Sequence, residues 1–207
     1  MSRKPALSLL LLLWLSGSAW GAEGKGANWV VNGDFKTAQG WTGTLTTQPG
    51  RGGEPALYLE NAKPDWNSRT QGITLPQPPP AVLEISGWMK TDKVIRGARD
   101  WENARISLVF YDAKGTRLGD WPPTVASLDG THDWDYYSNQ YPLPKGSASV
   151  TLEVGLGNCA GRAWFSGIRC LAYDYDSKPL APGQAAHPGL KPARTVKTDN
   201  WIKDPDF

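Results

Sequence analysis

Short runs of strand-forming residues, separated by clusters of glycine and proline, constrain this 207-residue chain more than any other feature of its sequence. The runs alternate apolar and polar residues or are rich in β-branched and aromatic residues, which is typical of strands. We expect strands over residues 29–35, 56–59, 71–75, 82–91, 105–111, 134–141, 149–156 and 163–172. No segment has the apolar periodicity of a helix of three turns. The pattern therefore predicts an all-β sandwich or barrel rather than βαβ units.

The first 21 residues have the three parts of a secretory signal peptide. Ser2-Arg3-Lys4 is basic, residues 6–15 are apolar, and Ala19-Trp20-Gly21 fits the small residues that precede a signal peptidase cut. The apolar run is shorter than the ~20 residues of a membrane span, and no later segment approaches that length. We expect cleavage after Gly21, with Ala19 or Ala22 as alternatives, and a mature protein that is secreted or periplasmic.

Cleavage removes the apparent basic character of the chain. The full sequence has 22 Lys and Arg against 20 Asp and Glu, and residues 1–21 contribute Arg3 and Lys4 but no acid. The mature chain is therefore neutral, which gives no electrostatic reason to expect nucleic acid or an anionic membrane as a partner. Nine of the 11 tryptophans remain, which is more than a core of this size needs.

Composition divides the mature chain into three parts. Residues 28–175 hold the expected strands and are long enough to bury a core without a metal or disulfide. Residues 176–198 are rich in proline, alanine and glycine, which predicts an extended linker. Residues 199–207 repeat the Asn, Trp, Asp and Phe of residues 27–35 in register. This echo is either chance or the start of a second β module.

The sequence contains no motif for nucleophilic or metal-dependent catalysis. His132 is the only histidine in residues 28–175, and no G-x-S-x-G or H-E-x-x-H motif accompanies it. We expect His132 to bond a neighbouring carbonyl or carboxylate. Acidic residues are numerous enough for a glycosidase, but their spacing does not place two of them at catalytic separation. We therefore predict no catalytic residues and no metal ligands.

Cys159 and Cys170 are the two cysteines of the chain, and two cysteines in an exported protein suggest a disulfide. If residues 157–161 form a hairpin turn, however, Cys170 lies about nine residues down the returning strand. The distance would then be roughly 30 Å, far more than a disulfide allows. Either the hairpin is wrong or the two residues are a turn thiol and a strand thiol, and we favour the second interpretation.

Side chains on the polar faces of three expected strands are the main sign of function. In residues 82–91, 105–111 and 149–156, the alternation that buries aliphatic residues leaves aromatic and charged residues on the other face. These residues are Glu84, Trp88, Arg105, Tyr111 and Glu153. If the three strands share a sheet, its outer face offers flat rings for the C–H face of a sugar and polar groups for its hydroxyls.

Other tryptophans lie beside turn residues or in apolar strands. Trp66, Trp101 and Trp121 are in polar loops, where each is either a plug for the end of the sandwich or a ligand contact. We expect Trp66 and Trp101 to contact ligand. The tryptophans in or beside apolar strands predict core positions, and these are Trp29, Trp41, Trp134 and Trp164.

An ordered set of short motifs resembles carbohydrate-binding modules of the family 4, 9 and 22 group, which are galactose-binding-like β-jelly rolls. The matching segments are Asn32-Gly33-Asp34-Phe35 with Trp41, then residues 85–91, 101–106, 110–115, 132–134 and 163–168. The resemblance implies an antiparallel two-sheet β-sandwich of the jelly-roll type. It also implies non-catalytic binding of a plant-type β-glycan such as xylan or β-glucan. The ligand contacts would be Trp88, Tyr111, Glu84, Arg105, Glu153, Trp66 and Trp101. A monomer acting with a glycoside hydrolase domain or subunit is the expected arrangement.

Two features depart from this group. Its members commonly hold a structural calcium through acids at positions that here read Lys36 and Ser166-Gly167. Because calcium needs carboxylate or carbonyl oxygens, we expect no calcium there, and Lys36 itself would fill the space. The chain also lacks a catalytic domain. The chain is then expected to be a fragment, a subunit or a stand-alone binder. Two other functions stay open as alternatives: a protein-interaction or cell-surface domain whose loop tryptophans bind a protein, and a jelly-roll lyase or hydrolase with two facing acids.

Overall fold

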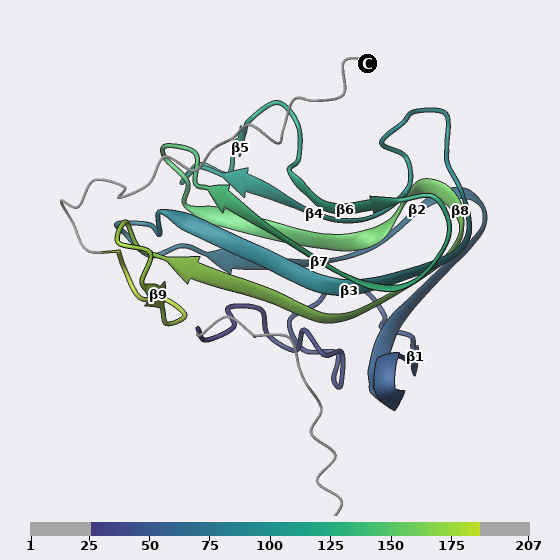
Figure 1. The fold of residues 1–207 in the computed structure, drawn as a ribbon. Helices are drawn as coiled ribbons and strands as arrows, with labels where there is room; N and C mark the ends of the chain where they lie inside the picture. The colour runs from purple at the N-terminus through teal and green to yellow at the C-terminus, as the bar shows by residue number, and fades with distance from the viewer. Residues whose placement is uncertain (1–25, 187–207) are drawn as a thin grey trace, which may run out of the picture.

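The computed structural model describes residues 26–186, which contain nine strands and one short 3-10 turn (Figure 1). The predicted signal peptide and the echo at residues 199–207 lie outside the described residues. Among those that are described, no helix is long and apolar enough to cross a membrane. The strands are β1 (Thr47–Pro49), β2 (Pro55–Thr74), β3 (Val82–Ile95), β4 (Ala104–Tyr111), β5 (Arg117–Leu118), β6 (Thr124–Leu128), β7 (Gly130–Pro142), β8 (Ser149–Tyr173) and β9 (Pro179–Leu180).

The strands form two antiparallel layers that share β2 and β8. In the first layer, residues 159–173 of β8 lie between β3 and residues 55–61 of β2, with β1 and β7 at the edges. In the second layer, residues 149–156 of β8 lie between β4 and residues 67–74 of β2, and β5 and β6 pair with β4. Figure 1 shows β2 and β8 turning together at one end of the molecule. The predicted two-sheet jelly-roll sandwich is confirmed.

Irregular pairing lets β2 and β8 pass from one layer to the other. The register shifts twice between Asn61 and Asn67 of β2, as in β-bulges that bend a strand. Asn61 replaces the lost ladder bonds, because its Nδ2 donates to the carbonyls of Asp65 (2.7 Å) and Cys159 (2.9 Å). On β8, Gly161 has φ +115°, and a Cβ there would lie 2.5 Å from the Lys93 carbonyl oxygen. The bend therefore depends on this glycine.

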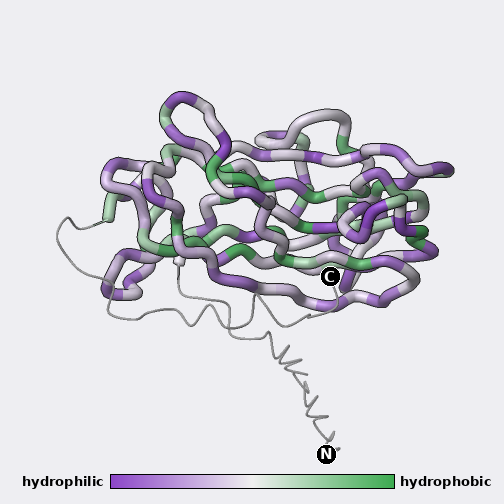
Figure 2. Tube along the Cα trace, turned by 90° about the horizontal axis from the view of Figure 1, so that it is seen from above, coloured by the Kyte–Doolittle hydropathy of each residue, from purple (hydrophilic) through white to green (hydrophobic). Residues whose placement is uncertain are grey.

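The core lies between the layers, where the inward faces of β3 and β4 meet those of β2 and β8. Leu83, Ile85 and Met89 of β3 are fully buried, as are Ile106 and Leu108 of β4. This agrees with the alternation expected from the sequence. Figure 2 shows hydrophobic residues along the strands and hydrophilic residues mainly in the connecting loops.

Residues 29–35 were expected to form a strand but are an irregular segment that packs on β8. Asn32 and Phe35 have φ of 54° and 55°, which no strand accommodates. The segment is nevertheless fixed, because the Trp29 N–H donates to Cys170 (2.8 Å) and the Ile168 N–H donates to Gly33 (2.9 Å). Trp29, Phe35 and Trp41 are buried, which confirms the core positions predicted for the two tryptophans.

Each of the two long strands joins segments that were expected to be separate. Residues 56–59 and 71–75 were expected as two strands, yet β2 runs through Pro55–Thr74, and β8 likewise joins residues 149–156 to 163–172. The predicted hairpin turn at residues 157–161 is therefore wrong, and so is the prediction that Cys159 is a thiol in a turn. Cys159 and Cys170 are both buried strand thiols that form no disulfide. Burial raises the pKa of Cys159 to about 11 and that of Cys170 to about 12.

The folded part continues beyond residue 175, into the stretch expected to be a linker. β9 pairs with Ala172 and Tyr173 of β8, and Leu180 is buried. The Leu180 carbonyl accepts a hydrogen bond from Trp29 Nε1 at 3.1 Å, which satisfies the buried indole N–H. Residues 179–186 are thus part of the domain.

Candidate functional site

The seven predicted ligand contacts lie on the two opposite outer surfaces of the sandwich. Glu84 and Trp88 are on the outside of the first layer, whereas Arg105, Tyr111 and Glu153 are on the outside of the second. Between them, a Cβ on Gly87 would lie 3.5 Å from Ile106 Cδ1, so the inner faces of β3 and β4 face each other. The expectation that the three strands share one outer face is wrong, because the bend in β8 puts β3 and β4 in different layers.

Trp66 and Trp101 join Arg105 to form a cluster at the bent end of the second layer, here called the Trp66 face. The two indole rings are 6.0 Å apart with an interplanar angle of 37°. The Arg105 guanidinium carbon lies 5.1 Å from the Trp66 ring and 5.7 Å from the Trp101 ring. Arg105 Nη1 also donates to the Trp101 carbonyl at 3.1 Å. Arg105 therefore holds both rings, while Trp66 stays 51% exposed.

Glu153 faces Arg105 without a direct hydrogen bond. Arg105 Nε and Glu153 Oε1 are 3.9 Å apart, which is an ion-pair distance but too long for a hydrogen bond. Both atoms are buried and neither has a hydrogen-bond partner. Gly157 makes room for this arrangement, because a Cβ there would lie 2.9 Å from Arg105 Nη2. The guanidinium that contacts both tryptophan rings is thus held beside a carboxylate.

Small and polar side chains continue the Trp66 face along the second layer. The outward positions between Arg105 and Tyr111 are Ser107 and Val109 on β4, with Thr151 and Gly155 on β8. Tyr111 pairs with Ser149 at the other end of β4. It is six residues from Arg105, a separation of about 20 Å along the strand. Tyr111 therefore lies on the predicted face but at its far end, outside the cluster.

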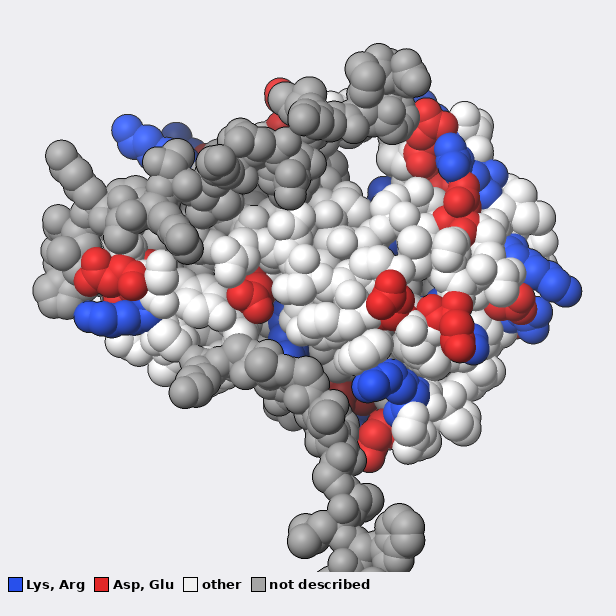
Figure 3. All heavy atoms as spheres, viewed as in Figure 1, with Lys and Arg blue, Asp and Glu red and all other residues white. Residues whose placement is uncertain are grey.

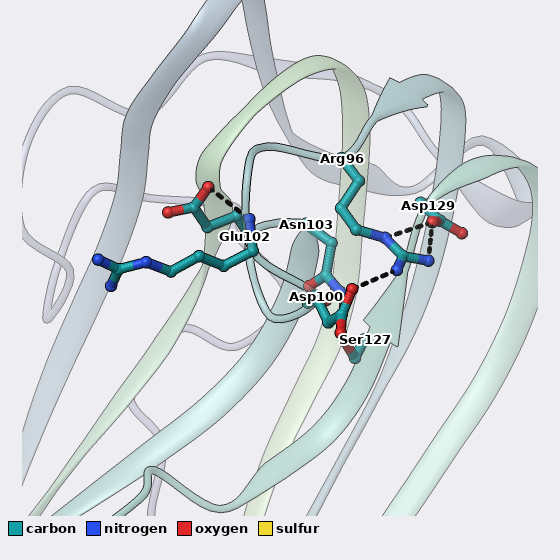
Figure 4. Close-up of polar contacts among 7 residues, drawn as sticks. Arg96, Asp100, Glu102, Asn103, Ser127 and Asp129 are labelled. Atoms are coloured by element: carbon teal, nitrogen blue, oxygen red, sulfur yellow. Dashed lines mark hydrogen bonds and ion pairs between the residues drawn. The ribbon is translucent and has the colours of Figure 1, made fainter. Parts of the chain in front are cut away.

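A polar network fixes the loop that carries Trp101 (Figure 4). Arg96 lies between two carboxylates, with Nε 2.9 Å from Asp129 Oδ2 and Nη1 3.0 Å from Asp100 Oδ1. Asn103 Nδ2 donates to Ser127 Oγ at 2.6 Å. The sequence analysis singled out only Trp101 in this loop. The bonds to Ser127 and Asp129 were missed, because they join residues 24 and 33 positions apart.

Glu102 anchors the same loop from the inside. Its side chain is buried, and Oε2 accepts the Arg99 N–H at 3.2 Å. The pKa of Glu102 is lowered, chiefly because the Asn158 side chain donates to the carboxylate and also because backbone N–H groups do. A pKa that is lower in the folded protein means that Glu102 stabilises the fold above its unfolded pKa and loses this effect as the pH falls through the folded pKa.

Glu102→Gln is therefore expected to lower the melting temperature at pH 7 and to matter less in acid. The amide cannot accept the same charge-assisted bonds, whereas in acid the native carboxyl is itself protonated. Thermal unfolding of both proteins between pH 7 and pH 3 measures the difference. A gap between the two melting temperatures that stays constant across this range would contradict the role of the charge.

The Trp88 face, on the outside of the first layer, holds the other two predicted contacts. Glu84 Oε2 accepts hydrogen bonds from Gln140 Nε2 (3.0 Å) and the Tyr173 hydroxyl (3.3 Å). Trp88 lies 5.1 Å from Tyr136. Trp164 is also on this face, half-buried, so its predicted core position is wrong. Trp134 is half-buried as well and does not belong to the core.

Lys36 occupies the region where the resembled modules would hold calcium. Its Nζ lies 3.4 Å from Asp34 Oδ2 and 3.3 Å from Glu54 Oε2. These carboxylates raise the pKa of Lys36, Glu54 more than Asp34. The ammonium group therefore lies between these two carboxylates. Within residues 26–186, no group of three or more His, Cys, Asp or Glu side chains is arranged to hold a metal.

His132 has the local role expected for it. Its Nε2 lies 2.7 Å from the Asp129 carbonyl oxygen, at the start of β7.

Comparison with known proteins supports the fold. No protein-family model and no curated protein matches the chain. Among solved structures, the enzymatically active domain of bacteriophage CBA120 tailspike protein 4 matches with a TM-score of 0.52 and 18% identity, over 69% of this chain. The two share a fold. The match covers only 21% of the tailspike chain, so the activity of the tailspike protein is not transferred to this chain.

Carbohydrate-binding modules, the group that the sequence resembles, are also among the matching structures. A family 16 carbohydrate-binding module has 18% identity and a TM-score of 0.48, covering 69% of this chain and 99% of the module. The CBM22-1–GH10 modules of a Clostridium thermocellum endo-1,4-β-D-xylanase, complexed with xylohexaose, have 17% identity and a TM-score of 0.47. That match covers 72% of this chain and 28% of the other.

Proposed function

We propose that this protein binds a β-glycan chain at the Trp66 face without altering it chemically. The observation that carries the proposal is the pair of Trp66 and Trp101 rings, 6.0 Å apart with Trp66 51% exposed, beside Arg105 and its ion-pair partner Glu153. Indole rings pack against the C–H face of a sugar, and the adjacent charged groups bond its hydroxyls. The strip that leads to Tyr111 gives a longer chain room to lie along the layer. Xylan and β-glucan are the polymers that the sequence resemblance favours.

The groups gathered on this face favour binding over hydrolysis. Glycoside hydrolysis needs two carboxyl groups that flank the scissile bond. The Trp66 cluster instead combines two indole rings, a guanidinium and one carboxylate, and Arg105 is the nearest charged partner of that carboxylate. Such a set orients and holds a sugar.

We further propose that the protein acts outside the cytoplasm, as a monomer beside a glycoside hydrolase, and needs no structural calcium. Export rests on the predicted signal peptide, and the hydrolase partner rests on the sequence resemblance. The absence of a calcium requirement rests on Lys36, whose ammonium lies between Asp34 and Glu54.

Trp66→Ala and Trp101→Ala are each expected to weaken glycan binding about tenfold, because each removes one of two stacking rings. The measurement is affinity gel electrophoresis of the mature chain in soluble xylan and in mixed-linkage β-glucan. Trp121→Ala is the matched control, because Trp121 is a 74% exposed tryptophan of the loop between β5 and β6, outside the cluster.

If the polysaccharide gels retard both cluster variants as strongly as the unaltered protein, the Trp66 face is not the binding site. Unretarded migration of the unaltered protein in every polysaccharide, together with concentration-dependent self-association, would favour a protein-interaction domain. Release of reducing ends from either polysaccharide would favour an enzyme.

A further inference from the structure

Four aromatic side chains cross the Trp88 face in one stripe, on the side of the sandwich away from the proposed glycan site. They come from four neighbouring strands: Tyr58 from β2, Trp164 from β8, Trp88 from β3 and Tyr136 from β7. Tyr58 and Trp164 have ring centroids 5.1 Å apart, and so do Trp88 and Tyr136.

Strand register places the two ring pairs next to each other. Trp164 is paired across the sheet with both Tyr58 and Lys90, and Trp88 lies two residues from Lys90 along β3. The stripe spans three strand spacings of about 4.8 Å, or about 14 Å across the layer. Tyr136 is 44% exposed and the other three rings are half-buried. A row of partly exposed rings of this length suits an extended ligand rather than a single small molecule.

Polar groups around the rings are positioned to bond hydroxyls. Trp164 Nε1 donates to Gln48 Oε1 at 2.9 Å, which fixes the ring and leaves the amide nitrogen of Gln48 as a donor. Arg51 stacks on one face of Trp88, with its guanidinium carbon 3.8 Å from the ring centroid. Its N–H groups stand beside the stripe, where they can donate to an occupant.

Charges on this face compensate one another. Lys90 Nζ lies 2.9 Å from Asp133 Oδ1, and Arg162 pairs with Asp92. On the side of the molecule drawn in Figure 3, the described acidic and basic residues are interspersed and form no large patch of one sign. Internally paired charges complement an occupant that is neutral, has apolar faces and carries hydroxyls.

We propose that the Trp88 face is a second binding surface for a neutral β-glycan, so that one molecule holds two polysaccharide chains on opposite sides. The Tyr58, Trp164 and Tyr136 rings stack on sugar rings, while Gln48 and Arg51 bond hydroxyls. The surface is separate from the Trp66 face, because the core of the sandwich lies between them. Two sites on one rigid domain cross-link separate chains or bind one folded-back polymer with added avidity.

Calorimetric titration of the mature chain with xylohexaose and with cellohexaose, together with turbidity of soluble xylan, tests this proposal. The double variant Trp164→Ala, Tyr136→Ala removes stacking rings from the Trp88 face. The double variant Trp66→Ala, Trp101→Ala removes those of the Trp66 face. Tyr136→Ala alone serves as a milder variant, because its side chain is 44% exposed and its loss is expected to leave the fold intact. Trp121→Ala is again the control.

We expect two sites per chain and xylan turbidity for the unaltered protein and the control. Each face variant should keep one site and lose at least tenfold in turbidity, and the combined variant should keep none. One site that disappears with Trp66 and Trp101, and is unchanged by the Trp164 and Tyr136 substitutions, would overturn the second surface and leave the proposed function standing. One site that disappears only with the Trp164 and Tyr136 substitutions would overturn the Trp66 face as a glycan site and leave the Trp88 face as the binding surface. No binding of either oligosaccharide would overturn both.

Discussion

Arg105→Met is expected to weaken glycan binding at the Trp66 face at least tenfold, or about 1.4 kcal/mol. The substitution removes the guanidinium that contacts both indole rings, donates to the Trp101 carbonyl and pairs with Glu153. Methionine keeps a similar length of apolar stem, so the loss reports the charged planar group. Arg105→Lys is expected to recover little, because an ammonium has no planar group to contact two rings or to donate in a fixed plane.

Titration of xylohexaose into both variants measures the effect, with the melting temperature as a check of folding. Arg117→Met is the matched control, since Arg117 is an exposed arginine that donates to the Asp120 carbonyl away from the cluster. Binding by Arg105→Met within twofold of the unaltered protein would refute the role of Arg105.

Gly33→Ala is expected to destabilise the domain by about 3 kcal/mol, the cost of forcing an extra methyl group into a packed site. An added Cβ would lie 2.0 Å from the Ile168 carbonyl oxygen, which is backbone that cannot rotate away. The Ile168 N–H also donates to the Gly33 carbonyl, so a shift that relieves the clash breaks this bond. For a domain of this size, the melting temperature should fall by roughly 6–12 °C.

Gly72→Ala is the matched control for this stability test. Gly72 is in β2 and a Cβ there would meet nothing within 4 Å, so alanine should be neutral or stabilise by about 0.5 kcal/mol. Urea unfolding of the two variants gives both values. Equal stabilities for Gly33→Ala and Gly72→Ala would show that the junction between residues 28–35 and β8 does not limit stability.

Local patterns in the sequence were sufficient to predict the fold class and the inward faces of the strands. The period-two alternation in β3 correctly separated buried Leu83 and Ile85 from outward Glu84 and Trp88, because one face of each strand meets the core. The core position predicted for Trp164 was wrong, although the same alternation in β8 places this residue outward. The surrounding apolar residues suggested a buried segment, whereas the outward side is covered with other aromatic rings.

The division of the predicted site depended on pairing that no local pattern contains. Gly157 and Gly161 were interpreted as a turn, since glycine marks turns more often than it marks a bend within a strand. Here Gly157 makes room for Arg105, and Gly161 lets β8 pass Lys93 and Val94. Once β8 is one strand, β3 and β4 fall on opposite layers and the seven contacts divide into two surfaces. The cluster of Trp66, Trp101 and Arg105 forms only through that topology.

The continuity of β2 and β8 also determines how the domain bears load. Neither layer is a separate mechanical unit, because the same two backbones form the centre of both. Tension applied by a polymer on one outer surface passes through covalent bonds around the bend to the strands that support the other surface. It need not be carried by side-chain packing between the sheets. Detaching one layer requires breaking the β2–β8 ladder, so the two layers are expected to resist force and to fail as one.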